Sequence, residues 1–371
     1  IYTSEIHRST MAVFIAKVIV MAVWSFLLFA NANKCSYAFV PFTGTISHKA
    51  LPFSPRSLLK MVSIGEACGL SYEEPLFRPP AEWRSLILQV TIGCSWNRCT
   101  FCEMYQEKKF SARPIDDIVD EIDAVVMAGG APYVRDVFLA DGDAMTLPTG
   151  HLVQILDAIT IKFPNLRRVS SYCLPRNIQG KSVEALTSLR QRGLSLVYVG
   201  CESGDDTVLA AVNKGETYAS SLNALEKLRN SGMKRSVMIL LGLGGSDYTI
   251  PHALNSAKLC SAAQPEFLSV LTTSFPRGRS RVEDGFRKIS ESPFVELNPR
   301  EGLDELKRFL EAIEIPNNRT IFRSDHASNY LVLKGRLGKD KPKLLSQLCD
   351  ILDAPEEDDE IHLRPEWARG L

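Results

Sequence analysis

Six short apolar runs alternate with amphipathic helical stretches, and this alternation constrains the fold more than any other feature of the sequence. The runs lie at 86–92, 134–139, 168–172, 194–199, 237–241 and 267–271. Helical patterns lie between them, at 114–128, 149–162, 180–191, 217–231 and 250–263. Parallel strands need long connections, which a helix usually supplies. We therefore expect an α/β fold, a partial (β/α)6 barrel resembling a TIM barrel, and a doubly wound parallel sheet is the alternative that periodicity does not separate from it.

The pattern becomes less regular after Thr273. Helices are expected at 301–313 and 341–352, with a segment over 323–335 that contains His326. A lone histidine of this kind is more often a hydrogen-bonded structural residue than a catalytic one. The resulting domain prediction is a linker over 61–82, a core over 83–285 and a small, mostly α extension over 286–371.

Residues 1–60 are interpreted as a targeting leader that is cleaved. No acidic residue occurs between Glu5 and Glu66. Lys17 precedes an apolar run over 18–30 and a small-residue cleavage pattern, which is the order of a secretory signal. A basic segment rich in Ser and Thr follows from Phe39, and the whole resembles the two-part leaders of algae with complex plastids. We expect a plastid location through a signal peptide and a transit peptide, with a secretory or endomembrane protein as the alternative.

Charge limits the kinds of partner. Residues 66–371 hold 37 basic and 42 acidic side chains, a net charge of about −5. Bulk attraction of the mature part to nucleic acid or to an anionic membrane is therefore not indicated. We also expect no stable membrane insertion of the mature chain. A basic patch is the one exception that the sequence suggests, and it could meet a phosphorylated or nucleic-acid substrate. It would consist of Lys108, Lys109, Arg176 and Lys214.

Three cysteines follow the first predicted strand closely. Cys94, Cys99 and Cys102 fall within nine residues of one polar loop. Thiolates at this density can converge on one metal centre, and thiolate is the ligand that iron–sulfur clusters select. A four-iron cluster with three protein ligands keeps one iron open for a small molecule.

Other uses of the three cysteines are weaker. A zinc site needs a fourth ligand, but His151 and Cys173 are distant in sequence. A redox pair formed by Cys99 and Cys102 leaves Cys94 unexplained. An iron–sulfur cluster is therefore the preferred prediction.

Polar clusters mark the ends of the later strands. Asp141, Gly142 and Asp143 end the second, where the glycine lets the backbone approach a ligand and the carboxylates could attract an ammonium group. An ordinary Asx-type turn is the alternative. Barrels of this kind place their active sites at the carboxyl ends of the strands. The further clusters at this edge include Tyr172, Cys173, Cys201, Glu202, Ser203 and Gly242.

The cysteine loop resembles that of the radical S-adenosylmethionine (SAM) superfamily, in which three cysteines hold a [4Fe–4S] cluster and an aromatic residue, here Phe101, precedes the third. The superfamily's commonest spacing is three residues and then two, whereas this chain has four and then two. The longer string from Cys94 to Tyr105 is similar to an uncharacterised branch near the elongator-type and methylthiotransferase-type cores. The resemblance covers about residues 86–273.

The resemblance implies a function and further site residues. It implies an enzyme that binds a [4Fe–4S] cluster and SAM and splits SAM reductively into methionine and a 5′-deoxyadenosyl radical. A low-potential electron donor such as ferredoxin or flavodoxin would serve it. The implied cofactor-binding residues are Phe101, Asp141, Gly142, Asp143, Tyr172, Glu202, Ser203 and Gly242, with Cys94, Cys99 and Cys102 as metal ligands.

Alternatives stay open for several of these residues. Glu202 could instead pair with Arg176 or Lys214 and hold the barrel mouth in shape. Gly242 could serve close packing of helix against strand, and Cys173 and Cys201 could be packing residues. A non-catalytic iron–sulfur electron carrier or sensor, or a zinc or thiol-redox protein, are the rival functions.

Overall fold

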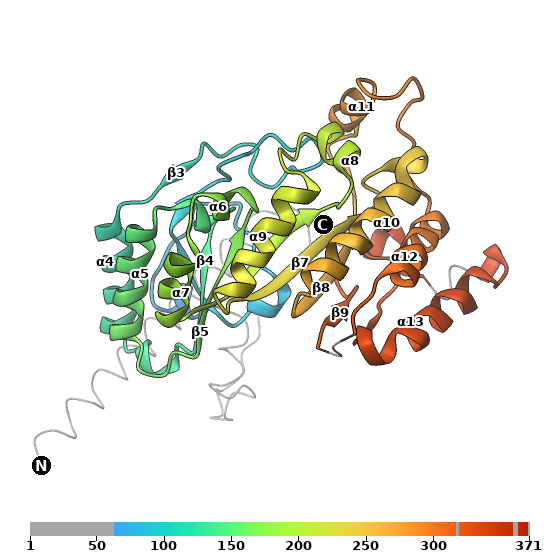
Figure 1. The fold of residues 1–371 in the computed structure, drawn as a ribbon. Coiled ribbons are helices and arrows are strands. Elements are labelled where there is room, and N and C mark those ends of the chain that lie inside the picture. Colours follow the sequence, from blue (N-terminus) through green and yellow to red (C-terminus); the bar gives the residue numbers. More distant parts are fainter. Residues whose placement is uncertain (1–62, 317–318, 359–362, 370–371) are drawn as a thin grey trace, which may run out of the picture. The chain divides into compact units, whose positions relative to one another are not determined.

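An eight-stranded sheet forms the frame of residues 63–371 (Figure 1). Its strands lie in the order β1-β4-β5-β6-β7-β8-β9-β10, and only the last pair is antiparallel. The strands are β1 (Leu86–Gln89), β4 (Asp136–Ala140), β5 (Arg168–Cys173), β6 (Leu194–Glu202), β7 (Lys234–Leu241), β8 (Phe267–Thr272), β9 (Ile321–Arg323) and β10 (Lys334–Arg336).

The six predicted strands are confirmed as β1 and β4–β8. They stand side by side in the order of the chain, without the reversal that defines a doubly wound sheet. Sequential parallel strands are the arrangement of a (β/α) barrel. The partial barrel is therefore the correct one of the two predicted architectures.

Helices join the strands and cover one face of the sheet, as Figure 1 shows. Each of the five predicted connecting helices is present. They are α4 (Ile115–Met127), α5 (Thr149–Lys162), α7 (Val183–Gln191), α9 (Tyr218–Asn230) and α10 (Gly245–Ala263). Shorter helices are α3 (Ile64–Ala67), α6 (Arg176–Gln179), α8 (Asp206–Ala211) and α11 (Ser280–Phe286).

Alternation along the strands separates two hydrophobic layers. Val137 and Leu139 of β4 face the helices and join the main core, whereas Phe138 between them faces the other way. On that concave face Phe138 packs with Tyr198, and Tyr72, from the segment before β1, covers them. The concave face is thus the part of the sheet that helices leave free.

The region after β8 extends the same sheet. Helix α12 (Pro299–Ala312) leads to β9, and α13 (Leu337–Leu352) follows β10. The two predicted helices are present, but β9 and β10 were not predicted, because strands of three residues are too short to show alternation. The boundary expected at residue 285 falls within α11.

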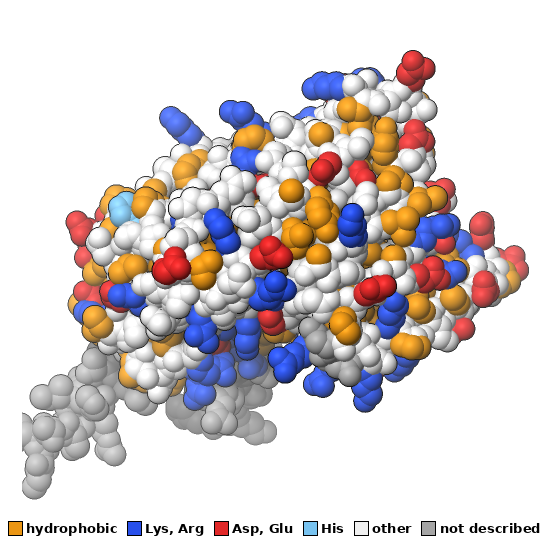
Figure 2. Space-filling model, viewed as in Figure 1, with side chains coloured by type: hydrophobic (Ala, Val, Ile, Leu, Met, Phe, Trp, Pro, Cys, Tyr) orange, Lys and Arg blue, Asp and Glu red, His pale blue; other side chains and the backbone are white. Residues whose placement is uncertain are grey.

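The structure is a computed structural model and describes residues 63–316, 319–358 and 363–369. The predicted leader over 1–60 lies outside these residues. Within them, no helix is both long and apolar enough to cross a membrane. Figure 2 shows acidic and basic side chains mixed over the helical face, with hydrophobic side chains between them.

Arg235 of β7 bonds two of the helices to the sheet. Its side chain is 1% exposed and donates to the carbonyl oxygens of Leu225 (3.2 Å), Ala263 (2.9 Å) and Gln264 (2.9 Å). It also binds Glu266 at 2.9 Å. One guanidinium therefore bonds a carbonyl within α9 and two carbonyls at the end of α10.

We predict that Arg235→Met lowers the free energy of unfolding by about 3 kcal/mol, because several buried acceptors lose their donor. Urea denaturation of the full chain measures the change. Arg229→Met, which removes a 44% exposed arginine from α9, is the matched control and should change stability by about 0.5 kcal/mol or less. Equal effects of the two substitutions would contradict this role of Arg235.

Candidate metal centre and cofactor site

A hairpin closes the base of the cysteine loop. Strand β2 (Thr91–Ile92) pairs with β3 (Ser111–Ala112), and the loop between them carries all three cysteines. Asn97 adopts a left-handed conformation (φ 40°), and its side-chain amide donates to the carbonyl oxygen of Tyr105 at 2.7 Å. The loop is thus folded back on itself at the carboxyl end of β1.

The three thiols are free and largely enclosed by protein. Burial raises the pKa of each, that of Cys99 to about 12, while the Lys214 ammonium acts to lower all three. Cys94 and Cys102 also raise the pKa of Cys99, so the three groups lie within electrostatic reach of one another. Metal binding at these groups would have to displace the thiol protons, since the thiolate is the ligand.

No three His, Cys, Asp or Glu side chains converge on a single-ion site anywhere in the described part of the chain. A four-iron cluster binds each cysteine through a different iron and therefore holds the sulfurs farther apart than one ion does. The donor set, three free thiols on one loop, fits such a cluster better than a mononuclear zinc site.

The turn after β4 is bonded directly to the cysteine loop. Gly93 N–H donates to Asp141 Oδ2 (3.0 Å), and Gly142 N–H donates to the Gly93 carbonyl (3.1 Å). A Cβ on Gly142 would lie 2.9 Å from the Cβ of Cys94, so only glycine permits this approach. The Asp141–Asp143 turn and the first cysteine therefore occupy one place at the carboxyl edge of the sheet.

The two carboxylates of this turn differ in their partners. Asp141 Oδ2 forms a buried ion pair with the Lys108 ammonium at 2.8 Å. Its Oδ1 and the Tyr105 hydroxyl are buried without hydrogen-bond partners among the described residues. Asp143 accepts from Ser95 N–H (2.9 Å) and the Asn177 amide (3.2 Å), and burial raises its pKa. Besides burial, Asp141 also acts to raise the pKa of the Tyr105 hydroxyl, so the phenol lies close to this carboxylate.

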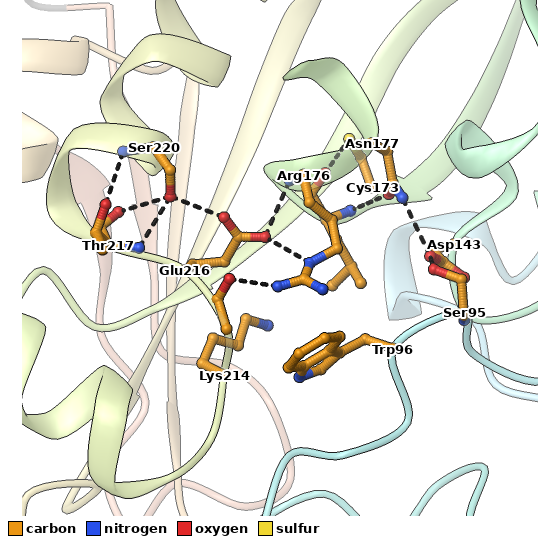
Figure 3. A network of polar contacts seen from close by, with 12 residues as sticks. Ser95, Trp96, Asp143, Cys173, Arg176, Asn177, Lys214, Glu216, Thr217 and Ser220 are labelled. Atoms are coloured by element: carbon orange, nitrogen blue, oxygen red, sulfur yellow. Dashed lines mark hydrogen bonds and ion pairs between the residues drawn. The ribbon is translucent and has the colours of Figure 1, made fainter. Parts of the chain in front are cut away.

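Trp96 joins the cysteine loop to the loops that follow β5 and β6 (Figure 3). Its indole N–H donates to the Asn213 carbonyl at 2.8 Å, and the Arg176 guanidinium lies 3.7 Å from the ring centroid. Arg176 in turn binds Glu216 at 3.0 Å. The tryptophan therefore anchors the loop.

A second buried ion pair lies at the end of β6. The Lys214 ammonium is 3.1 Å from Glu202 Oε1, and the lysine side chain is 3% exposed. This is one of the two pairings that the sequence left open for Glu202, whereas Arg176 pairs with Glu216 instead. Lys214 also lies 6.0 Å from the Phe101 ring, so its charge stands beside the third cysteine.

Arg281 of α11 also supports the cysteine loop. Its guanidinium donates to the carbonyl oxygens of Cys99 (2.9 Å) and Cys102 (3.3 Å). Sequence reasoning missed this residue, because no local pattern links an arginine to a loop about 180 positions earlier. It places a positive charge on the backbone of two of the three predicted ligands.

The other predicted cofactor-binding residues lie at this edge with different surroundings. Tyr172 packs edge-on against Phe138 on the concave face. The Ser203 hydroxyl is fully buried and bonded to His252 Nδ1 (2.8 Å) and the Asp205 N–H (2.9 Å). Gly242 adopts φ +79°, and its N–H donates to Glu305 at 2.7 Å. Their contacts with SAM stay predictions.

Cys173 and Cys201 belong to the helix side of the sheet. Both are buried in the main hydrophobic core, which agrees with the packing alternative. His326 accepts a hydrogen bond from the Ser328 N–H (3.1 Å) within its own loop, so its local contacts are structural.

The expected basic patch does not form on the surface. Lys108 and Lys214 are buried in ion pairs with Asp141 and Glu202. This prediction was wrong because the acidic partners come from other strand ends, which spacing along the chain does not reveal.

Comparison with known proteins identifies the domain. Residues 88–257 match the radical SAM superfamily. The chain is 27% identical over 162 residues to a tRNA-2-methylthio-N(6)-dimethylallyladenosine synthase of Nitrosomonas europaea, covering 41% of this chain and 35% of that one. It is 19% identical over 165 residues to the heme chaperone HemW of Bacillus subtilis, covering 43% of each.

Solved structures match the chain only loosely. Coproporphyrinogen III oxidase of Escherichia coli, described as a radical SAM enzyme, aligns with a TM-score of 0.46 and 18% identity over 70% of this chain and 55% of that one. The chain spans less than half the length of the curated relatives named above.

We predict that Cys94→Ser, Cys99→Ser and Cys102→Ser each prevent stable assembly of a cluster, because two thiolates hold it far less firmly than three. Iron and sulfide content after anaerobic reconstitution is the measurement. Cys349→Ser, a change outside the loop, should bind as much iron as the unchanged protein. Full iron loading of any of the three loop variants would remove that cysteine from the ligand set.

Proposed function

Since residues 88–257 make this chain a member of the radical SAM superfamily, we propose that it holds a [4Fe–4S] cluster on Cys94, Cys99 and Cys102 and cleaves SAM reductively. When bound, the cluster supplies one electron to SAM, which yields methionine and a 5′-deoxyadenosyl radical. That radical would abstract hydrogen from a substrate, which would lie at the concave face of the sheet. Cofactors carry the difficult chemistry, and the protein binds, orients and excludes water.

The observation that carries this proposal is the position of the three thiols. They are the cysteines of a single loop, and that loop is bonded to the Asp141–Asp143 turn at the carboxyl edge of parallel strands. Active sites of (β/α) barrels form at this edge. With three protein ligands for four irons, one iron is left for the amino-acid end of SAM.

Charges beside the loop suit that zwitterionic end. Asp141 and Asp143 provide carboxylates on one side, which would receive an ammonium group. Lys214 provides an ammonium near the thiols on another side, which would receive a carboxylate. The residues thus offer opposite charges to the two charged groups of an amino acid.

The concave face supplies an apolar wall. Phe138 and Tyr172 meet edge-on with ring centroids 5.1 Å apart, and Tyr172 and Tyr198 meet at 6.1 Å. Partly buried Met238 and Phe267 pack against the same cluster. Such a surface excludes water, which a carbon radical requires.

The partner and the location are extensions of this proposal. Reduction needs a low-potential donor, for which a ferredoxin or flavodoxin is suitable, and the leader-like sequence over 1–60 supports import into a plastid. An iron–sulfur carrier without SAM chemistry and a zinc protein are the competing outcomes of the test below.

The test is anaerobic reconstitution of the full chain with iron and sulfide, followed by reduction and addition of SAM. We expect formation of 5′-deoxyadenosine by the loaded protein and none by Cys99→Ser. A loaded cluster that never cleaves SAM would exclude the enzyme, and recovery of zinc without iron would exclude the cluster.

We predict that Lys214→Met raises the KM for SAM about 10-fold or more with unchanged iron content, because a charged hydrogen bond contributes about 1.5–3 kcal/mol. This substitution also leaves the Glu202 carboxylate without its partner, so the double variant Lys214→Met/Glu202→Gln separates the two effects. The double variant should regain the stability of the unchanged protein, while its KM for SAM should stay raised.

Lys214→Arg keeps the charge, so its KM for SAM should lie between that of the unchanged protein and that of Lys214→Met. Lys162→Met, at an exposed ion pair on α5, is the control and should leave the KM unchanged. A normal KM in both Lys214→Met variants would show that Lys214 does not bind SAM.

A further inference from the structure

A polar pocket of about 390 Å³ lies beside the cysteine loop, outside the ligand set described above. Three segments meet there: the cysteine loop, the start of α5 and the region of α6. Its polar lining consists of Ser95, Thr146, Thr149, Arg176, Asn177 and Lys181. The volume is within the range of about 300–1,000 Å³ typical of small-molecule sites.

Lys181 lines this pocket, and within the described residues no acidic side chain balances its charge. Its side chain belongs to a residue that is 8% exposed, and burial lowers its pKa. The ammonium donates to the Leu147 carbonyl at 2.8 Å and has no carboxylate partner within the described residues. An ammonium carries three N–H donors, and this contact uses one of them. Burial of a cation without a counter-ion is unfavourable, and an anionic ligand would offset it.

The amino end of α5 opens onto the same pocket. Pro148 occupies the cap position and has no side chain that could accept from the first turn. Thr149 lines the pocket. The His151 and Leu152 N–H groups donate to the Pro148 carbonyl, and among the described residues those of Thr149 and Gly150 have no partner. Helix α5 has 14 residues, so its dipole favours an anion at this end.

The charges around the pocket leave it positive. No Asp or Glu stands among the described residues that line it. Arg176 is bound by Glu216, and Asp143, which does not line the pocket, accepts from both Ser95 and Asn177 (Figure 3). Lys181 and the helix terminus are therefore the parts of the lining that favour an anion.

We propose that this pocket binds the phosphate group of a small phosphomonoester. An ammonium, free N–H groups of the helix end and the hydroxyls of Thr146 and Thr149 surround one space, and a phosphate has enough oxygens to accept from all of them. The volume leaves room for the organic part of the ligand. The site goes beyond the proposed SAM chemistry and does not depend on a bound cluster.

The test is titration calorimetry of the full chain with ribose 5-phosphate, inorganic phosphate and ribose at constant ionic strength. We expect binding of ribose 5-phosphate, weaker binding of phosphate and none of ribose. Lys181→Gln should weaken the binding of ribose 5-phosphate at least 10-fold, and Lys162→Gln, at the other end of α5, should not change it.

Gly150→Asp gives a second test, because this substitution should leave the protein folded. A Cβ at Gly150 meets no atom within 4 Å, and a carboxylate in the first turn of a helix is favourable. The variant should keep or raise the Tm, and its affinity for ribose 5-phosphate should fall at least 10-fold. Unchanged affinity in Gly150→Asp, equal affinity for phosphate and ribose 5-phosphate, or no binding by the unchanged protein would overturn the proposal.

Discussion

Hydrogen bonds between the turn after β4 and the loop after β1 determine where the three thiols stand. Gly93, Ser95 and Gly142 contribute the backbone groups, and Asp141 and Asp143 accept from the loop. The turn belongs to a strand that pairs directly with β1, so the loop is held by the sheet itself. Asn213, which accepts from the Trp96 indole of the loop, and Arg281, which donates to the Cys99 carbonyl, then fix the outer side of the loop from more than 100 positions along the chain. The parallel sheet therefore determines where a metal centre on this loop would lie.

Three ion pairs surround this arrangement, and their acidic members lie almost wholly out of water. They are Lys108–Asp141, Lys214–Glu202 and Arg176–Glu216. Buried pairs contribute little net stability, because desolvation offsets much of the attraction. Their value here is geometric and electrostatic, since they gather cations beside thiols that must become thiolates. Against the effect of burial, Lys214 acts to lower the pKa of all three thiols, whereas Asp143 acts to raise that of Cys94 and Glu202 those of Cys99 and Cys102.

The sequence predicted the repeated features and missed the long-range ones. Alternation over 86–271 was sufficient to predict six strands and five helices. Cysteine spacing predicted a ligand triplet, and that assignment stays a prediction. Strands β9 and β10 were not predicted, because each has only three residues. The partner of Glu202 was left open between two cations, and Arg281 was not considered, because their contacts depend on how strand ends and α11 come together in space. Ser203 illustrates the same limit. Its motif suggested a ligand contact, but its hydroxyl is hydrogen-bonded to His252, which lies 49 positions later in the chain.

The central claim is that an iron of a three-cysteine cluster is open to SAM. Electron paramagnetic resonance of the reduced, reconstituted full chain, recorded before and after addition of SAM, tests it most directly. The account predicts a spectrum of a reduced [4Fe–4S] cluster that changes when SAM is added. A reduced cluster whose spectrum is the same with and without SAM would contradict the account.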